Sequence, residues 1–208
     1  MSLRYNEKAR RADERRRVIF STLRYNPLVA GAAGATCIVG SCVSLSNALV
    51  LIVLLAALLP LVALVSCSES ERIKPVMRPA FYCFITALTV FLLSLLLDNV
   101  IAPGCVTALG IYAPLLAFDG LVLSRTAPDA PILTVRESMT EALTVLVCAA
   151  VIAIPVGIVR ELLAEGTLFS VVYDANSPFR RPFFGFFLCA FVLAAFRAAA
   201  QRFIKEDA

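Results

Sequence analysis

One uncharged stretch places the strongest constraint on this chain. From Tyr25 to Ser68 no Lys, Arg, Asp or Glu occurs. A membrane-spanning helix needs about 20 mostly apolar residues, so this stretch has room for two spans. Of the 208 residues, 60% are hydrophobic and only 16% are charged, whereas about a quarter of residues are charged in an average soluble domain. The excess of apolar side chains predicts an all-α integral membrane protein.

The hydrophobic segments predict six transmembrane helices. We place them near residues 27–45, 47–66, 79–97, 105–124, 139–159 and 183–200. A charged or turn-forming segment follows each of them, except between the first two, where only a short turn at Ser46 and Asn47 separates the spans. The predicted units are a basic segment over 1–26, a three-helix repeat over 27–100, a second repeat over 101–200 and a tail over 201–208.

The positions of Lys and Arg predict the orientation. The Arg-rich start, two of the charged loops and the tail all lie on one side of the six predicted spans. The positive-inside rule therefore favours both termini in the cytoplasm. The start shows no cleavable signal-peptide pattern. Because the net charge of +4 lies mainly beside spans, it indicates contact with anionic lipid headgroups rather than with nucleic acid.

The first and fourth predicted spans share an unusual composition. Residues 26–49 read "NPLVAGAAGATCIVGSCVSLSNAL" and residues 107–120 read "TALGIYAPLLAFDG", so small, polar or helix-breaking residues fall at membrane depth. Each stretch opens a unit of three spans, and an odd number of spans places the two units in opposite orientations. This pattern is typical of inverted repeats whose interrupted helices meet near the membrane midplane. The alternative interpretation is that small residues only allow helices to pack closely.

Two acidic positions are candidates for a functional role. A carboxylate at membrane depth normally faces a bundle interior or a wet path, which makes Asp119 a candidate for an ion path. The alternative is that Asp119 reaches the membrane interface near Arg125. Glu141 is a second ion-path candidate, although a solvated carboxylate in the first turn of the fifth span is the favoured explanation. For Arg160 and Glu161 we expect an anchor at the interface.

The remaining composition excludes several classes of site. The chain contains no His, and its seven cysteines include no CxxC pair. A disulfide framework, a zinc site and nucleophilic catalysis by a Ser–His or Cys–His pair are therefore not expected. No catalytic residue is predicted, and the chain is not expected to be an enzyme on its own.

Several motifs in order resemble the Rnf/Nqr family of membrane subunits. They are "NPLVAGAAGATC", "MRPAFY", "LGIYAPLLAFDGLVLSR", "RELLAEGTLF" and "NSPF", and the resemblance is closest to the RnfE/NqrD branch. It implies six helices as two inverted three-helix repeats, with interrupted first and fourth helices. It also implies an RnfA/NqrE-like paralogous partner, flavin- and iron–sulfur-containing subunits, and a location in the bacterial inner membrane. The complex would be a Na⁺- or H⁺-translocating NADH:quinone or ferredoxin:NAD oxidoreductase.

The resemblance further implies an intramembrane [2Fe–2S] cluster to which each of the two paralogous subunits gives two cysteines. The family positions of these ligands correspond to Thr36 and Gly120, and neither is Cys. Cys37 lies one residue from the first position, and Glu141 takes the place of a family Asp in the fifth span. We therefore expect a degenerate half-site in which Cys37 and Asp119 are the remaining candidate ligands, or no cluster bound through this chain's own side chains.

Two other functions stay open. One is a non-redox transporter of a small solute or ion that uses the same inverted-repeat fold, with Asp119 as its essential residue. The other is a purely structural subunit, in which neither Asp119 nor Cys37 is required for activity.

Overall fold

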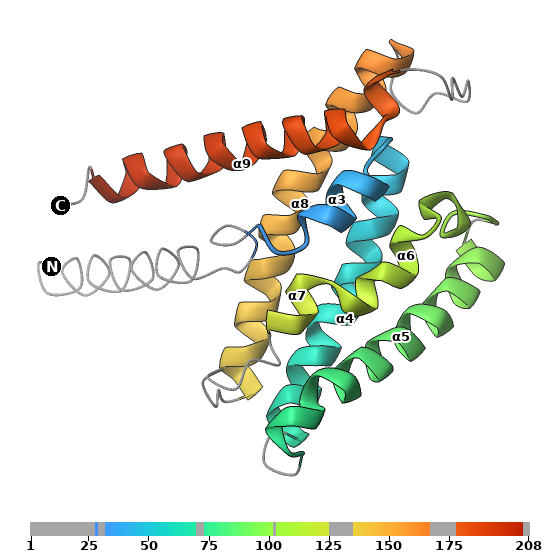
Figure 1. The fold of residues 1–208 in the computed structure, drawn as a ribbon, viewed down its shortest axis with the longest axis vertical. Coiled ribbons are helices and arrows are strands. Elements are labelled where there is room, and N and C mark those ends of the chain that lie inside the picture. The colour runs from blue at the N-terminus through green and yellow to red at the C-terminus, as the bar shows by residue number, and fades with distance from the viewer. Residues whose placement is uncertain are drawn as a thin grey trace, which may run out of the picture.

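The computed structural model describes residues 28, 32–69, 73–101, 103–124, 135–166 and 178–205, and this part of the chain is helical without any strand (Figure 1). Three helices are long and apolar enough to cross a membrane: α4 (Leu45–Glu69), α5 (Arg78–Leu96) and α8 (Val135–Glu165). Two further apolar segments are shorter and cover Tyr112–Leu123 and Pro182–Ala198. The predicted all-helical class is confirmed for the described residues.

The long helices extend beyond their predicted limits. α4 begins at Leu45, two residues before the predicted start at 47, and α8 covers Val135–Glu165 instead of 139–159. Glu141 therefore lies in the second turn of α8, and its predicted place in the first turn is wrong. The helix includes the polar residues 136–138 because its backbone hydrogen bonds do not depend on whether the side chains are apolar.

The first apolar stretch does not form one long helix in the described residues. Only α3 (Ala35–Ser41) is helical between residues 32 and 44, and α4 starts after a three-residue connection. Gly34 precedes α3 with a φ of 86°, a left-handed conformation that side chains with a Cβ adopt only with strain. The turn predicted at Ser46 and Asn47 lies earlier, at residues 42–44.

The fourth predicted span, near 105–124, is divided into short pieces. They are η3 (Thr107–Leu109), α6 (Tyr112–Leu115), η4 (Leu116–Phe118) and α7 (Gly120–Leu123). The chain is extended at Asp119, with φ −70° and ψ 150°, so the helix breaks immediately before α7. This segment follows the π-helical turn η2 (Leu97–Ile101) at the end of α5, where Asp98 Oδ1 accepts a hydrogen bond of 2.8 Å from the Val106 N–H.

α4 and α8 form the centre of the molecule and run side by side in opposite directions (Figure 1). The two broken segments contact each other and this pair: α3 packs on α4, α8 and α6, and α7 packs on α4. α3 contacts α9 (Pro182–Lys205), and η4 and α7 contact α5. Each broken segment thus also packs against one of the outer helices, α9 or α5.

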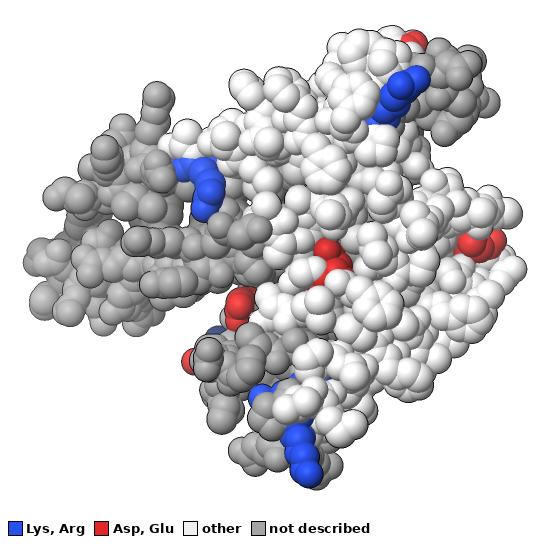
Figure 2. All heavy atoms as spheres, viewed as in Figure 1, with Lys and Arg blue, Asp and Glu red and all other residues white. Residues whose placement is uncertain are grey.

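The visible surface carries few charges. Figure 2 shows Lys and Arg toward the ends of the molecule and a few acidic groups, one of which lies near the middle of an otherwise uncharged face. α5 and α9 contribute large exposed apolar side chains to the surface: Phe84, Leu88, Phe91, Leu92, Phe183, Phe186, Phe187 and Phe191. Such a surface matches a chain that is surrounded by lipid or by other membrane helices.

Candidate functional site at the crossing of the broken segments

The two broken segments touch at their breaks. A Cβ added to Gly120 would lie 3.1 Å from Cβ and 3.3 Å from Cα of Ala33. In the other direction, a Cβ added to Gly34 would lie 2.7 Å from Leu121 Cδ1 and 3.0 Å from Asp119 Oδ2. We call this contact between residues 33–37 and 119–121 the crossing. Its closeness depends on the absence of side chains at Gly34 and Gly120.

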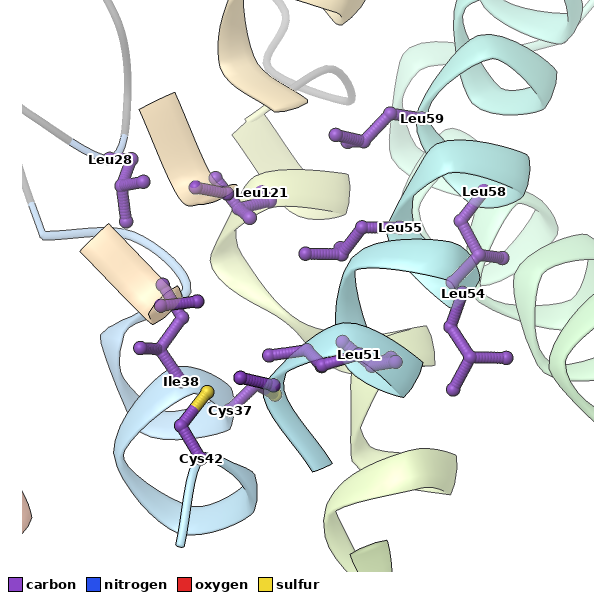
Figure 3. Close-up of a cluster of buried hydrophobic side chains, with 14 of the residues drawn as sticks. Leu28, Cys37, Ile38, Cys42, Leu51, Leu54, Leu55, Leu58, Leu59 and Leu121 are labelled. Atoms are coloured by element: carbon purple, nitrogen blue, oxygen red, sulfur yellow. The ribbon is translucent and has the colours of Figure 1, made fainter. Parts of the chain in front are cut away.

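The crossing is packed within the apolar core. Leu28, Cys37, Ile38 and Leu121 belong to the same buried cluster as the leucines of α4. In Figure 3, Leu55 and Leu59 point from α4 toward Leu121. This packing explains why the two breaks are held together: apolar side chains from three segments fill the space around them.

Asp119 is the charged group at the crossing. It is only 5% exposed, and its carboxylate lies near the start of α7 and near the Cys37 thiol, although its side chain makes no capping hydrogen bond to that helix. Its second oxygen, Oδ2, is buried and has no hydrogen-bond partner. The predicted alternative, that Asp119 reaches the membrane interface, is wrong because the side chain is buried inside the described part of the molecule.

The structure brings together some of the predicted site residues and separates others. Cys37, Asp119 and Gly120 meet at the crossing, through the interaction of Cys37 with Asp119 and the contact of Gly120 with Ala33. Thr36 is exposed, although its neighbour Cys37 is buried. Glu141 is half-buried on α8, and its role in an ion path stays a prediction.

The residues at the two positions where the resemblance implies cluster ligands do not fit a [2Fe–2S] half-site. Such a cluster requires thiolates, but Gly120 has no side chain and Thr36 offers only a hydroxyl. The one thiol at the crossing, Cys37, is buried against Asp119. No group of three or more His, Cys, Asp or Glu side chains that could hold a metal ion occurs within the described ranges.

A buried arginine holds the end of α3. Arg160 on α8 is only 1% exposed, and its Nη1 donates hydrogen bonds to the carbonyl oxygens of Val39 and Cys42, the latter at 3.2 Å. Carbonyls at the end of a helix lack helical partners, and a guanidinium can satisfy several of them at once. Nε also donates to the Phe179 carbonyl at 3.2 Å, which connects α3 to the start of α9.

The next residue holds the start of α4. Glu161 is also only 1% exposed, and its Oε2 accepts a hydrogen bond of 2.8 Å from the Leu45 N–H. The expectation that Arg160 and Glu161 anchor the membrane interface is therefore wrong, since both are buried and stabilise the connection between α3 and α4. Adjacent opposite charges directly after a long apolar run were the available signal, because burial requires such charges to be paired or hydrogen-bonded.

A similar polar contact supports the second broken segment. Thr86 on α5 is fully buried, and its hydroxyl has three carbonyl acceptors within reach: Tyr82 at 2.8 Å and Cys83 at 3.0 Å in its own helix, and Ala117 at 3.1 Å. Ala117 lies in η4, two residues before the break. Tyr112 of α6 packs directly on α3, where a Cβ added to Gly40 would overlap its ring. Polar side chains of the continuous helices α5 and α8 thus contact both broken segments, and Tyr112 packs one broken segment against the other.

Comparison with known proteins adds one finding. The family model described as "Rnf-Nqr subunit, membrane protein" matches residues 16–201 of the chain. No curated protein matches it. The matched range includes the crossing and also Arg160, Glu161 and Thr86.

Proposed function

Because the chain belongs to the Rnf-Nqr family of membrane subunits, we propose that this multi-pass membrane protein is one subunit of an Rnf/Nqr-like ion-translocating oxidoreductase complex. The single observation that carries this proposal is the family match, which extends over residues 16–201. The proposed role is to take part in transmembrane electron transfer or in its coupling to Na⁺ or H⁺ movement. The chain has no catalytic activity of its own in this proposal.

The proposed architecture is two inverted three-helix repeats with six spans, of the RnfE/NqrD type. The antiparallel central pair α4 and α8, and the meeting of two broken segments beside it, support this proposal. In inverted-repeat membrane proteins, interrupted helices from the two halves meet at the functional centre. The crossing takes that place here, and both termini are proposed to lie in the cytoplasm.

The proposed partners are an RnfA/NqrE-like paralogous subunit and the flavin- and iron–sulfur-containing subunits of the same complex, in the bacterial inner membrane. We propose that this chain's own side chains hold no cluster. The donor set at the crossing supports this, since Gly120 and Thr36 provide no thiolate and Cys37 is buried against Asp119. Electron transfer through the membrane would then depend on groups in the partners.

Purification through a tag on this chain tests the proposal. We expect flavin- and iron–sulfur-containing subunits to co-purify in fixed ratio, and the isolated complex to reduce an electron acceptor. The iron and acid-labile sulfide content, together with low-temperature EPR, then counts the clusters. Recovery of a stable, colourless homo-oligomer that has no redox partner would overturn the proposal.

A second function is favoured by one observation, the buried Asp119 carboxylate with an unpaired Oδ2. A carboxylate in this position suits a non-redox transporter of a small solute or ion. In that case, vesicles that contain only this chain would take up the solute, and Asp119→Asn would abolish uptake. Uptake that requires redox partners would exclude this second function.

A further inference from the structure

The turn before α5 lies at a membrane surface. It contains η1 (Pro75–Met77) and connects α4 to α5, two consecutive helices that are each long and apolar enough to cross a membrane. A connection between two such spans has to leave the hydrocarbon region. Two of its apolar side chains are nevertheless exposed, Val76 at 91% and Met77 at 62%. The turn therefore presents apolar side chains at the boundary between lipid and water.

A turn of the same sequence pattern before α9 is used inside the chain. The pattern Pro-x-x-Arg-Pro occurs at residues 75–79 and again at 178–182. In the second copy the Phe179 carbonyl accepts a hydrogen bond from Arg160, and the Phe179 ring packs edge-on against another Phe ring. Val76 has the corresponding position in the first copy, where it is almost fully exposed. The first turn is thus accessible to a partner outside the chain.

An apolar stripe continues from the first turn along α5. Met77, Phe81, Phe84 and Leu88 are all exposed and are spaced by four, three and four residues, so they lie on one face of the helix. We call these four residues the α5 stripe. α5 is the least buried of the three long helices and lies at the edge of the bundle (Figure 1). At 1.5 Å per residue the stripe is about 16 Å long, which is about half the thickness of the hydrocarbon core and therefore matches one leaflet.

The charge at the head of the α5 stripe is positive. Residues 73–78 include Lys74 and Arg78 and no acidic residue, since the acidic residues of the α4–α5 connection come earlier. Lys74 is exposed, and its carbonyl accepts a hydrogen bond of 2.9 Å from the Met77 N–H, which places it one turn before the stripe. Arg78 Nε donates to the Ile73 carbonyl at 3.3 Å and so stabilises the turn. A cation followed by an apolar stripe complements the two parts of an anionic phospholipid, its phosphate and its acyl chain.

We propose that the start of α5 binds an anionic phospholipid of the surrounding bilayer. Lys74 contacts the phosphate group, Arg78 is a positioning residue that stabilises the turn, and one acyl chain lies along the α5 stripe. A membrane helix of a partner subunit would also cover apolar side chains, but the cation at the head of the stripe favours a headgroup. The lipid site requires only that α4 and α5 cross a membrane, so it does not depend on the proposed function.

Photo-crosslinking in nanodiscs tests the lipid site. The complex, purified through a tag on this chain, is reconstituted in phosphatidylcholine with a small fraction of diazirine-labelled phosphatidylglycerol, or with the same fraction of diazirine-labelled phosphatidylcholine. Mass spectrometry of the peptides then measures how much of the α5 stripe is crosslinked to each probe. We expect the anionic probe to crosslink about five-fold more than the neutral one, which is the effect of one basic residue beside an anionic headgroup.

Two variants with matched controls separate the headgroup from the acyl chain. Lys74→Gln should remove the preference for the anionic probe, whereas Arg181→Gln, at an exposed position directly before α9, should keep it. Phe84→Ala should reduce crosslinking of both probes to the stripe, because it removes apolar contact area. Its control is Phe187→Ala on α9, since Phe84 and Phe187 are similarly exposed, at 68% and 71%. The Phe187 variant should crosslink to the α5 stripe as the wild type does.

Two kinds of result would overturn the lipid site. One is equal crosslinking of the stripe by the two probes in the wild type, or a preference that survives in Lys74→Gln. The other is a stripe that neither lipid reaches and that crosslinks to a membrane helix of a partner subunit, because a protein then covers it. Neither result concerns the co-purification of redox subunits, so the lipid site and the proposed function are tested by different measurements.

Discussion

Arg160 and Glu161 are neighbours on α8 and bind the two sides of the connection between α3 and α4. Arg160 donates to carbonyls at the end of α3, while Glu161 accepts from the first N–H of α4. One pair of adjacent residues therefore satisfies backbone groups on both sides of the break. This relationship explains how a short half-helix is held in place within an apolar core.

Replacement of Arg160 should destabilise the fold strongly. Arg160→Met leaves the carbonyls of Val39 and Cys42 without their hydrogen-bond donor and leaves the Glu161 carboxylate next to a neutral side chain. Removal of one member of a buried charged pair typically costs about 3–5 kcal/mol of folding stability. Arg160→Lys should be intermediate, because an ammonium cannot reach several carbonyls in the same geometry. Thermal unfolding in detergent measures the effect. Lys74→Met, at an exposed position shortly before α5, is the control and should change stability by less than about 0.5 kcal/mol.

The two substitutions Glu161→Gln and Glu161→Ala should differ. Gln keeps a carbonyl oxygen that can accept from the Leu45 N–H, whereas Ala leaves this buried donor unsatisfied at a cost of about 1–3 kcal/mol. Hydrogen exchange at the start of α4 is the direct readout. Equal exchange rates in the two variants would contradict the assigned hydrogen bond.

Addition of one methyl group at Gly34 should disrupt the crossing. Gly34→Ala places a Cβ within 2.7 Å of Leu121 Cδ1, so overpacking of about 1–3 kcal/mol adds to about 1–2 kcal/mol for the left-handed backbone. The matched control is Gly104→Ala, since Gly104 has a φ of 80° and no atom within 4 Å of an added Cβ. The control should show only the backbone cost. If both variants lose the same stability, the crossing is less closely packed than described.

The polar contact between α5 and the second broken segment should make a measurable contribution. Thr86→Val removes the hydrogen bond to Ala117 O, and such interhelical bonds in membranes contribute about 0.6 kcal/mol on average. Thr89→Val is the matched control, because the Thr89 hydroxyl bonds to Ile85 O within its own helix. We expect the Thr86 variant to lose more stability than the Thr89 variant. Reversible unfolding in detergent measures the difference.

Removal of the Cys37 thiol should leave the iron content of the complex unchanged. The proposed absence of cluster ligands in this chain means that Cys37→Ser does not alter iron, acid-labile sulfide or the EPR signals of the purified complex. Cys67→Ser, near the end of α4, serves as a procedural control. Loss of iron in the Cys37 variant alone would show that the crossing contributes a ligand.

The sequence predicted the class of the protein more reliably than the shape of its helices. The uncharged run from Tyr25 to Ser68 indicated membrane helices because lipid tolerates few charges, and long helices do occur there. The motifs also indicated the family. The limits of the helices were less accurate: α8 extends into polar residues, and the helix of the first segment is only seven residues long. Hydropathy indicates which segments are apolar enough to lie in lipid. It does not indicate at which residue the backbone hydrogen bonds of a helix end.

The candidate site illustrates the same division. Asp119 was a candidate because a carboxylate within an apolar run is rare, and the sequence alone shows that it lies in one. Its contact with Cys37 and the approach of Gly120 to Ala33 were not accessible, because these pairs are far apart in sequence. Arg160 and Glu161 were expected at the interface because the end of an apolar run looks the same whether it faces water or the backbone of another helix.

The sequence by itself determined that the chain is a helical membrane protein of this family and that Thr36 and Gly120 lack thiols, since composition and residue identity decide both. Only the tertiary structure decided that the two breaks touch and that Oδ2 of Asp119 is enclosed without a partner. It also decided that one adjacent charge pair holds the α3–α4 connection. These facts depend on which distant segments share a space, and that is decided by packing over the whole bundle.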